Sequence, residues 1–202
     1  MTDQVVYDLQ DDRWLTNRNQ LTPTRKKVVL TFDDGPGRHL IRILDILAER
    51  QAPAMFFWLT RTFYEARPWR RVIEEGHIIG SHSHKHQNLC KLTREQQYKQ
   101  IKTSVNQLEA VTGEKIRHFR PPFGQFNEDM MDILEELSLL PVMWEISSYD
   151  WQLKEQPKKI IDNVVSHIKD GSIILLHELP QTAAVLPDII DEVRKKGFDF
   201  IV

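Results

Sequence analysis

Two adjacent carboxylates, Asp33 and Asp34, end an apolar run in the stretch VVLTFDDGPG at residues 28–37. Two like charges side by side are costly to bury unless a cation compensates them. Aspartate, glycine and proline are also ordinary turn residues, so a solvated turn is the simplest interpretation of this stretch alone. The pair therefore indicates either a surface turn or a cation-binding site.

A histidine-rich stretch, GSHSHKHQNL, holds His82, His84 and His86. His82 and His86 are four residues apart, a spacing that brings two imidazoles to one metal ion in other two-histidine sites. A polar loop with scattered histidines is the alternative, and it suits His84. Two histidines and one carboxylate form the three-ligand set of catalytic zinc sites. The second aspartate could then act as a base, because neighbouring strand residues point to opposite faces.

Three further stretches place polar side chains after apolar runs. FRPPFG holds Arg120, whose guanidinium can pair with a carboxylate, although a rigid turn with a surface arginine is the simpler interpretation. SSYDWQ offers Asp150, which either hydrogen-bonds a histidine and raises its basicity or caps the next helix. Its neighbour Trp151 can be ordinary core. GSIILLHE is an apolar strand that ends in His177.

The elements that must position these side chains alternate along the chain. Apolar runs predict strands at residues 28–32, 54–59, 77–80, 117–119, 141–146, 173–176 and 198–202. Helical spacing predicts helices with faces formed by Leu40, Ile43, Leu44 and Leu47, by Tyr98, Ile101, Val105 and Leu108, and by Ile160, Ile161, Val164, Val165 and Ile168. This alternation implies an α/β fold with a parallel sheet. The chain is short for a complete eightfold barrel, so we expect an open sheet or a distorted, incomplete barrel.

The chemically interesting side chains all follow predicted strands. Just past the carboxyl ends of five strands come Asp33 with Asp34, His82 with His86, Arg120, Asp150 with Trp151, and His177. At that edge α/β barrels and open sheets assemble their active sites. Five such coincidences favour one functional site over a set of unrelated turns.

The composition limits the classes of protein to consider. A chain of 202 residues, 41% hydrophobic and 28% charged, suits one globular domain, and a net charge of −2 offers no electrostatic case for nucleic acid as partner. Its single cysteine, Cys90, excludes an intramolecular disulfide. We find no signal peptide or transmembrane run, which suits a cytoplasmic protein or the mature part of an exported one. We expect a polar arm at residues 1–26 before the domain at residues 27–202; oligomeric state is left open.

The motifs, taken in order, resemble those of the NodB-homology polysaccharide deacetylases, carbohydrate esterase family four. TFDDGP, HSHKH, RPPFG, DW and LLH occur in the family's order over roughly residues 28–202, and the connecting EEGHIIGSH and KKGFDFIV match as well. The resemblance implies a distorted, incomplete (β/α) barrel with about seven parallel strands. It also implies an N-acetylated glycan as substrate, whether chitooligosaccharide, peptidoglycan or exopolysaccharide.

The resemblance further implies a metal centre and a base. Asp34, His82 and His86 would hold a divalent ion, usually zinc, with cobalt or another divalent ion as alternatives. Asp33 would be the general base, oriented and tuned by Arg120. The chain would then be a metal-dependent hydrolase that releases acetate and leaves a free amine on the sugar.

The remaining implied roles concern the acid and the pocket. His177 would be the general acid, assisted by Asp150. Phe123, where the family commonly has tyrosine, would offer its backbone N–H to the developing oxyanion. Trp151 and Leu175 would wall the pocket for the acetyl methyl group.

Departures and alternatives bear mainly on the substrate. Gln87 replaces a frequent proline, Met55 a threonine and Ser147 an aspartate of the family pattern, and none of these changes removes a catalytic group. A haloacid dehalogenase phosphatase needs its second acid two residues after the first, which excludes it. An iron oxygenase of the facial-triad type would leave three of the polar candidates without roles. A hydrolase of O-acetyl xylan or a non-sugar amide, and a silent glycan-binding module, remain open.

Overall fold

A single parallel sheet runs through the protein, whose computed structural model describes residues 4–7, 11–23 and 25–202. Its strands are β1 (Lys27–Gly35), β2 (Ala54–Trp58), β3 (Ile78–Ser81), β4 (His118–Phe119), β5 (Leu140–Pro141), β6 (Ile146–Ser147), β7 (Ile173–His177) and β8 (Asp199–Phe200). They lie in the order β5-β4-β3-β2-β1-β7-β6, and β8 pairs with β1. Every strand pairing in these ladders is parallel.

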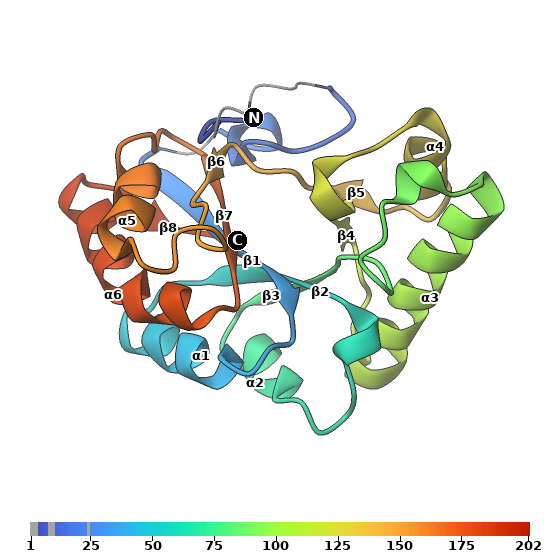
Figure 1. Ribbon diagram of the computed structural model, residues 1–202, viewed down its shortest axis with the longest axis horizontal. Coiled ribbons are helices and arrows are strands. Elements are labelled where there is room, and N and C mark those ends of the chain that lie inside the picture. Colours follow the sequence, from blue (N-terminus) through green and yellow to red (C-terminus); the bar gives the residue numbers. More distant parts are fainter. Residues whose placement is uncertain (1–3, 8–10, 24) are drawn as a thin grey trace.

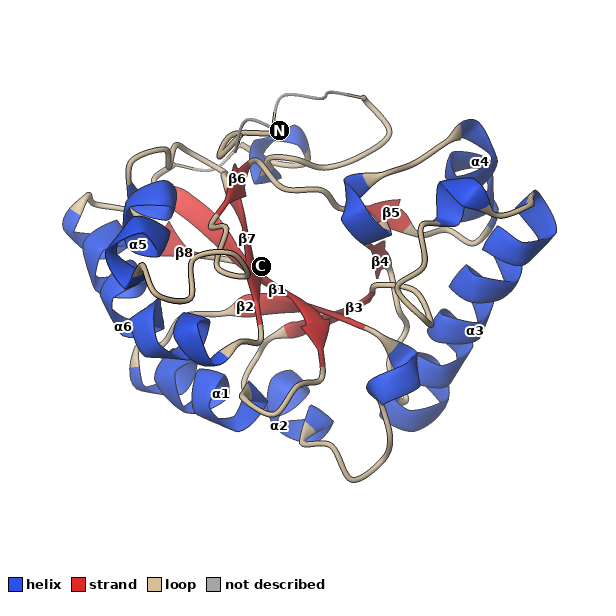
Figure 2. Cartoon of the chain, in the orientation of Figure 1, coloured by secondary structure: helices blue, strands red, loops and turns tan. Residues whose placement is uncertain are grey.

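The sheet curls into part of a barrel with helices on its outside (Figure 1). Figure 2 shows the strands as an inner layer and the helices as an outer one. The helices are α1 (Leu40–Glu49), α2 (Trp69–Glu74), α3 (Arg94–Thr112), α4 (Glu128–Glu136), α5 (Pro157–Val165) and α6 (Pro180–Lys195). No ladder joins β5 to β6 in the described part of the chain. The predicted distorted, incomplete barrel is confirmed.

The two faces of β1 pack into different apolar layers. Val28, Leu30 and Phe32 join the large core beneath the helices, whereas Val29 belongs to a second cluster with Phe57. Because side chains alternate along a strand, the odd-numbered residues of β1 face away from the helices. This alternation matters below, since Asp33 is odd-numbered.

The helices follow the predicted apolar faces. Ile101 and Leu108 of α3 are fully buried, and the helix begins at a capping box in which Thr93 and Gln96 exchange hydrogen bonds. It ends at Gly113, whose left-handed conformation suits glycine. Among the described residues, no helix combines the length and apolarity needed to span a bilayer.

One predicted strand, residues 141–146, is wrong as a single element. The structure has two short strands there, β5 and β6, at opposite edges of the sheet. The residues between them use their backbone elsewhere: the carbonyl groups of Val142 and Met143 accept hydrogen bonds from the guanidinium of Arg120. An apolar run alone cannot reveal such non-local partners, because it reports only that the segment is buried.

The N-terminal segment lies between β5 and β6, the two edge strands that no ladder joins to each other (Figure 1). Leu15 donates its N–H to Pro141 at 2.9 Å and accepts one from Met143 at 2.6 Å, while Val5 accepts the N–H of Ser147 at 2.8 Å. Trp14 is 1% exposed. Residues 1–3, 8–10 and 24 of the predicted arm lie outside the described residues, and the boundary at residue 26 stays a prediction.

Candidate active site

The end of β1 separates the two adjacent aspartates. Asp33 still follows strand geometry, paired with Phe57 on one side and His177 on the other. The register then shifts between Asp33 and Gly35, and Asp34 adopts a left-handed φ of 65°. Aspartate tolerates this conformation better than most residues. The two carboxylates therefore leave the strand differently, with the Asp33 side chain 4% and the Asp34 side chain 45% exposed.

Asp34 lies with two histidines in one cluster. Its Oδ1 is 3.4 Å from Nε2 of His86 and 3.8 Å from Nε2 of His82, and the three candidate ligand atoms lie within 4.8 Å of one another. His84 is outside this cluster, with its Nδ1 2.9 Å from the hydroxyl of Thr60. Carboxylate and imidazole are ligands that zinc accepts, so the donor set fits a divalent ion.

The tautomer and charge of His82 follow from its surroundings. Its Nδ1 is 2.7 Å from the carbonyl oxygen of Arg120, and a carbonyl only accepts, so Nδ1 carries the proton. Burial lowers the pKa of His82 to about 3, which leaves the ring neutral. Nε2 is therefore a lone-pair donor turned toward Asp34, the arrangement found in metal-ligating histidines.

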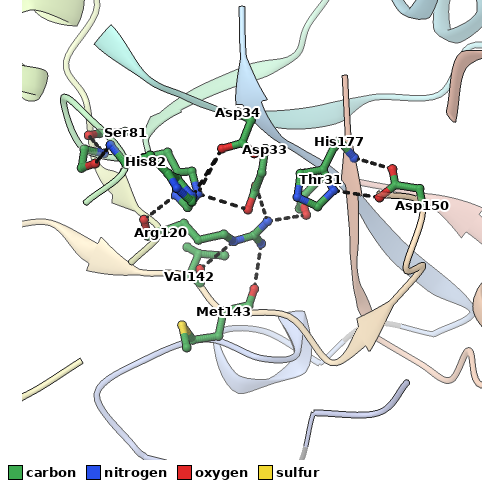
Figure 3. A network of polar contacts seen from close by, with 12 residues as sticks. Thr31, Asp33, Asp34, Ser81, His82, Arg120, Val142, Met143, Asp150 and His177 are labelled. Atoms are coloured by element: carbon green, nitrogen blue, oxygen red, sulfur yellow. Dashed lines mark hydrogen bonds and ion pairs between the residues drawn. The ribbon is translucent and has the colours of Figure 1, made fainter. Parts of the chain in front are cut away.

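Arg120 is buried at the centre of a polar network (Figure 3). It donates to Oδ1 of Asp33 at 2.7 Å, to the hydroxyl of Thr31 at 2.7 Å and to two backbone carbonyl groups at 2.8 and 2.9 Å. These four acceptors compensate the positive charge of the guanidinium, which would otherwise be costly to bury. The simpler interpretation of Arg120 as a surface residue is wrong.

The two oxygens of the Asp33 carboxylate have different surroundings. Oδ1 accepts from Arg120, and Oδ2 is 3.7 Å from Nε2 of His82. Burial raises the pKa of Asp33, and the positive charges of Arg120 and His177 act against that rise. The site thus holds a desolvated carboxylate beside the candidate metal ligands.

His177 and Asp150 form a second polar pair on the other side of the pocket (Figure 3). Nδ1 of His177 donates to Oδ1 of Asp150 at 2.8 Å, and the backbone N–H of His177 donates to Oδ2 at 2.7 Å. The hydroxyl of Thr182 also donates to Oδ2. Burial lowers the pKa of His177, but the hydrogen bond and charge of Asp150 outweigh it and raise that pKa to about 9.

A pocket of about 420 Å³ opens between these groups. Its lining includes eight of the ten predicted site residues: Asp33, Asp34, His82, His86, Phe123, Trp151, Leu175 and His177. Phe123, 58% exposed, lies 4.5 Å from the ring of His86, and Trp151, 42% exposed, lies 5.0 Å from that of His177. Trp151 is therefore not core. Arg120 and Asp150 are fully buried and touch the lining residues from behind.

The sequence analysis missed several residues around the site, among them Thr31, Thr182, Glu178 and Trp58. Thr31 hydrogen-bonds Arg120, Thr182 hydrogen-bonds Asp150, and Glu178 accepts from the indole of Trp58. Only Glu178 had a visible signal, as a charged residue directly after an apolar strand. The others are common core or helix residues whose contacts are long-range in sequence.

The fold and these contacts define a class of protein: an incomplete parallel barrel with an Asp-His-His cluster facing a His-Asp pair at its carboxyl edge. The family model described as polysaccharide deacetylase matches residues 20–142, and the chain belongs to that family.

Two curated relatives illustrate the membership. A chitooligosaccharide deacetylase of Azorhizobium caulinodans is 31% identical, with 89% of this chain and 93% of the relative covered. PdaC of Bacillus subtilis, a peptidoglycan-N-acetylmuramic acid deacetylase, is 32% identical over 92% of this chain. The chain spans only 38% of PdaC, and half of the uncharacterised YlxY of the same organism.

Two solved structures share the fold, but one is described as a deacetylase and the other as a pseudoenzyme. The Bc1960 peptidoglycan N-acetylglucosamine deacetylase is 31% identical with a TM-score of 0.82, covering 88% of this chain and 86% of its own. A wild-type family-four pseudoenzyme from Bacillus anthracis is 27% identical with a TM-score of 0.80, covering 88% and 64%. Membership and fold therefore support a deacetylase, while activity has to be argued from the site.

Proposed function

We propose that this chain is a metal-dependent hydrolase that removes N-acetyl groups from N-acetylglucosamine-containing polysaccharide. One observation carries the proposal: a buried carboxylate, a candidate three-ligand metal cluster and a histidine with a raised pKa all line one pocket. Hydrolysis of an amide needs a base for water and an acid for the departing amine. A binding module would need neither.

Asp34, His82 and His86 would hold the metal, with zinc the ion that their chemistry suits best. A divalent ion bound there would supply Lewis acidity toward the acyl oxygen and lower the pKa of a water. The neutral imidazole of His82, held through its Nδ1–H, is ready to ligate without losing a proton.

Asp33 would take the proton from the attacking water. Oδ2 of Asp33 is the oxygen not held by Arg120, and it faces the cluster. Arg120 would keep the carboxylate in one orientation and favour its charged form, since four hydrogen bonds fix the guanidinium. The metal's own charge would favour that form further.

His177 would protonate the departing amine. Its Nδ1–H is engaged by Asp150, so its Nε2–H is the proton available to the pocket. With a pKa of about 9, the ring is an imidazolium at neutral pH and able to donate. An amide nitrogen leaves poorly without that proton, and the acid is therefore as necessary as the base.

The pocket walls would select a small acyl group. Leu175 and Trp151 present apolar surface on the His177 side, which suits the methyl of an acetyl group. Phe123 has a left-handed φ of 62° in the turn after Arg120, and its backbone N–H would serve as a donor to the developing oxyanion.

The test is acetate release from N-acetylglucosamine oligomers by purified protein, with chelator and with zinc or cobalt added back. We expect release that stops on chelation and returns with metal. A protein that binds zinc but releases no acetate from any glycan would contradict the proposal.

The pseudoenzyme among the similar structures makes a silent glycan-binding module the second candidate. Against it stand the Asp33–Arg120 and His177–Asp150 pairs, which recognition alone would not require. Glycan binding without turnover would favour it, and acetate release from acetylated xylan instead would favour an esterase on the same site.

A further inference from the structure

A buried carboxylate beside the pocket has no part in the proposed reaction. Glu178 is 6% exposed, and its Oε1 accepts the indole N–H of Trp58 at 2.8 Å. Its Oε2 accepts the backbone N–H of Gly37 at 2.5 Å. Burial raises the pKa of Glu178 to about 7, and these two hydrogen bonds act in the opposite direction. The two oxygens of this side chain thus each meet one donor, Oε1 from Trp58 and Oε2 from Gly37.

These contacts connect three strands at the edge where the site lies. Glu178 follows directly after β7, Trp58 is the last residue of β2, and Gly37 lies just beyond β1. On the other side of the same loop, Leu59 donates its N–H to the carbonyl of Gly35 at 2.8 Å. A Cβ on Gly35 would overlap Oε1 of Glu178, so glycine is required for the carboxylate to approach. The loop after Asp34 is therefore held from both neighbouring strands.

The residue that this loop presents is the one that needs support. Asp34 sits where the β1–β2 register shifts, in a left-handed conformation. Such a conformation persists only when its surroundings hold it. Ligands of metal ions are likewise oriented by hydrogen-bonded groups behind them.

We infer that Glu178 is a positioning residue for the metal centre: by tying Gly37 to Trp58, it holds Asp34 in the conformation that faces His82 and His86. The inference rests on the proposed metal site. Glu178 is not among the residues that line the pocket, and its hydrogen bonds reach the loop through the backbone N–H of Gly37.

Zinc affinity of the metal-free protein, measured by competition with a chromophoric chelator, tests this inference without any turnover. In Glu178→Gln the side chain offers one acceptor to two donors and turns its NH₂ toward the other. We expect the dissociation constant for zinc to rise about tenfold. In the double variant Glu178→Gln/Trp58→Phe the opposing indole donor is gone and the glutamine oxygen can accept from Gly37, so zinc affinity should recover only to the level of Trp58→Phe alone, which lacks the same anchor.

A matched control separates positioning from general loss of stability. Glu109→Gln alters a carboxylate that also accepts a backbone N–H, in this case that of Ile116. Ile116 precedes β4 and therefore lies near the amino ends of the strands, away from the site at their carboxyl ends. Its dissociation constant for zinc should stay within about twofold of wild type. If Glu178→Gln does not fold, Trp58→Phe carries the test, with a smaller rise expected because one anchor of Glu178 is lost.

The outcomes are distinct. Unchanged zinc affinity in folded Glu178→Gln, or in folded Trp58→Phe where the first variant fails to fold, would overturn the inference and leave the proposed function intact. A wild-type protein that binds no zinc would overturn both. An equal loss in Glu109→Gln and Glu178→Gln would assign the effect to stability and refute positioning.

Discussion

At the scale of single residues, the two adjacent aspartates at the end of β1 have different surroundings. Asp33 is buried against Arg120, whereas the neighbouring Asp34 is turned out toward His86. The bulge in β1 produces this division, because two consecutive residues of a regular strand could not both reach the same region. The proposed base Asp33 and the proposed ligand Asp34 can thus be adjacent in sequence without competing for one role.

The first prediction separates these two roles. Asp33→Asn should lower turnover by at least about 100-fold, because the amide cannot accept the proton of water. It should leave zinc binding intact, since Asp34, His82 and His86 are unchanged. His82→Ala should lose both properties. Acetate release and zinc titration are the measurements, and near-normal turnover in Asp33→Asn would refute its assignment as base.

The second prediction concerns pH. Burial alone would lower the pKa of His177, and it is the hydrogen bond and charge of Asp150 that raise it to about 9. The acid must be protonated, so activity should persist to about pH 9 and fall above it. In Asp150→Asn the pKa of His177 drops, and the alkaline limb of kcat/KM should move to lower pH. A limb unmoved by the substitution would exclude His177 as the titrating acid.

At the scale of elements, the N-terminal segment lies in the gap between β5 and β6, which no ladder joins, and bonds to the connection between these strands. Tyr7 donates its N–H to the carbonyl of Glu145 and packs its ring 5.2 Å from Trp144, which lines the pocket. Asn17 donates to the carboxylate of Glu145. The segment therefore supports the connection between β5 and β6, which leads directly to Asp150.

The third prediction follows from this packing. Trp14 is buried with its ring 4.1 Å from that of Phe126, so Trp14→Ala should lower the free energy of unfolding by about 3 to 5 kcal/mol. Urea unfolding followed by circular dichroism measures it. Leu21→Ala, at a position 52% exposed, is the control and should stay within about 0.5 kcal/mol of wild type. Equal values for the two variants would mean that the segment does not stabilise the barrel.

At the scale of the whole molecule, the candidate metal centre joins residues at the ends of different strands. Asp34 is the next-to-last residue of β1, whereas His82 and His86 follow β3, two positions away in the sheet. A ligand that binds only the folded arrangement stabilises the entire domain by mass action.

The fourth prediction measures that coupling. Zinc at about 100 times its dissociation constant should add about 2.7 kcal/mol, which raises the melting temperature of a domain of this size by roughly 5 to 10 °C. Chelator should reverse the shift, and His82→Ala should show none. A similar shift in His82→Ala would place the stabilising zinc elsewhere on the protein.

The sequence alone was enough to predict the main elements of the fold and the position of the site. Alternating apolar runs and helical faces predicted a parallel sheet with helices, either open or an incomplete barrel, because burial imposes periods of 2 and 3.6 on any chain that forms these elements. The polar residues at strand ends predicted one site, since parallel strands bring their carboxyl ends to one edge. For Asp33 and Asp34, however, spacing showed only that one could ligate and the other act as a base.

Only the tertiary structure decided the contacts that join distant segments. The bulge at Asp34, the burial of Arg120, the hydrogen bond of Asp150 to His177 and the two partners of Glu178 all depend on strand register and on loops meeting across the barrel. The division of residues 141–146 into two strands and the packing of Trp14 into the core also depend on contacts between distant segments. A local pattern reports whether a residue is buried, but the residue that it packs against depends on how the strands pair and how the sheet curls.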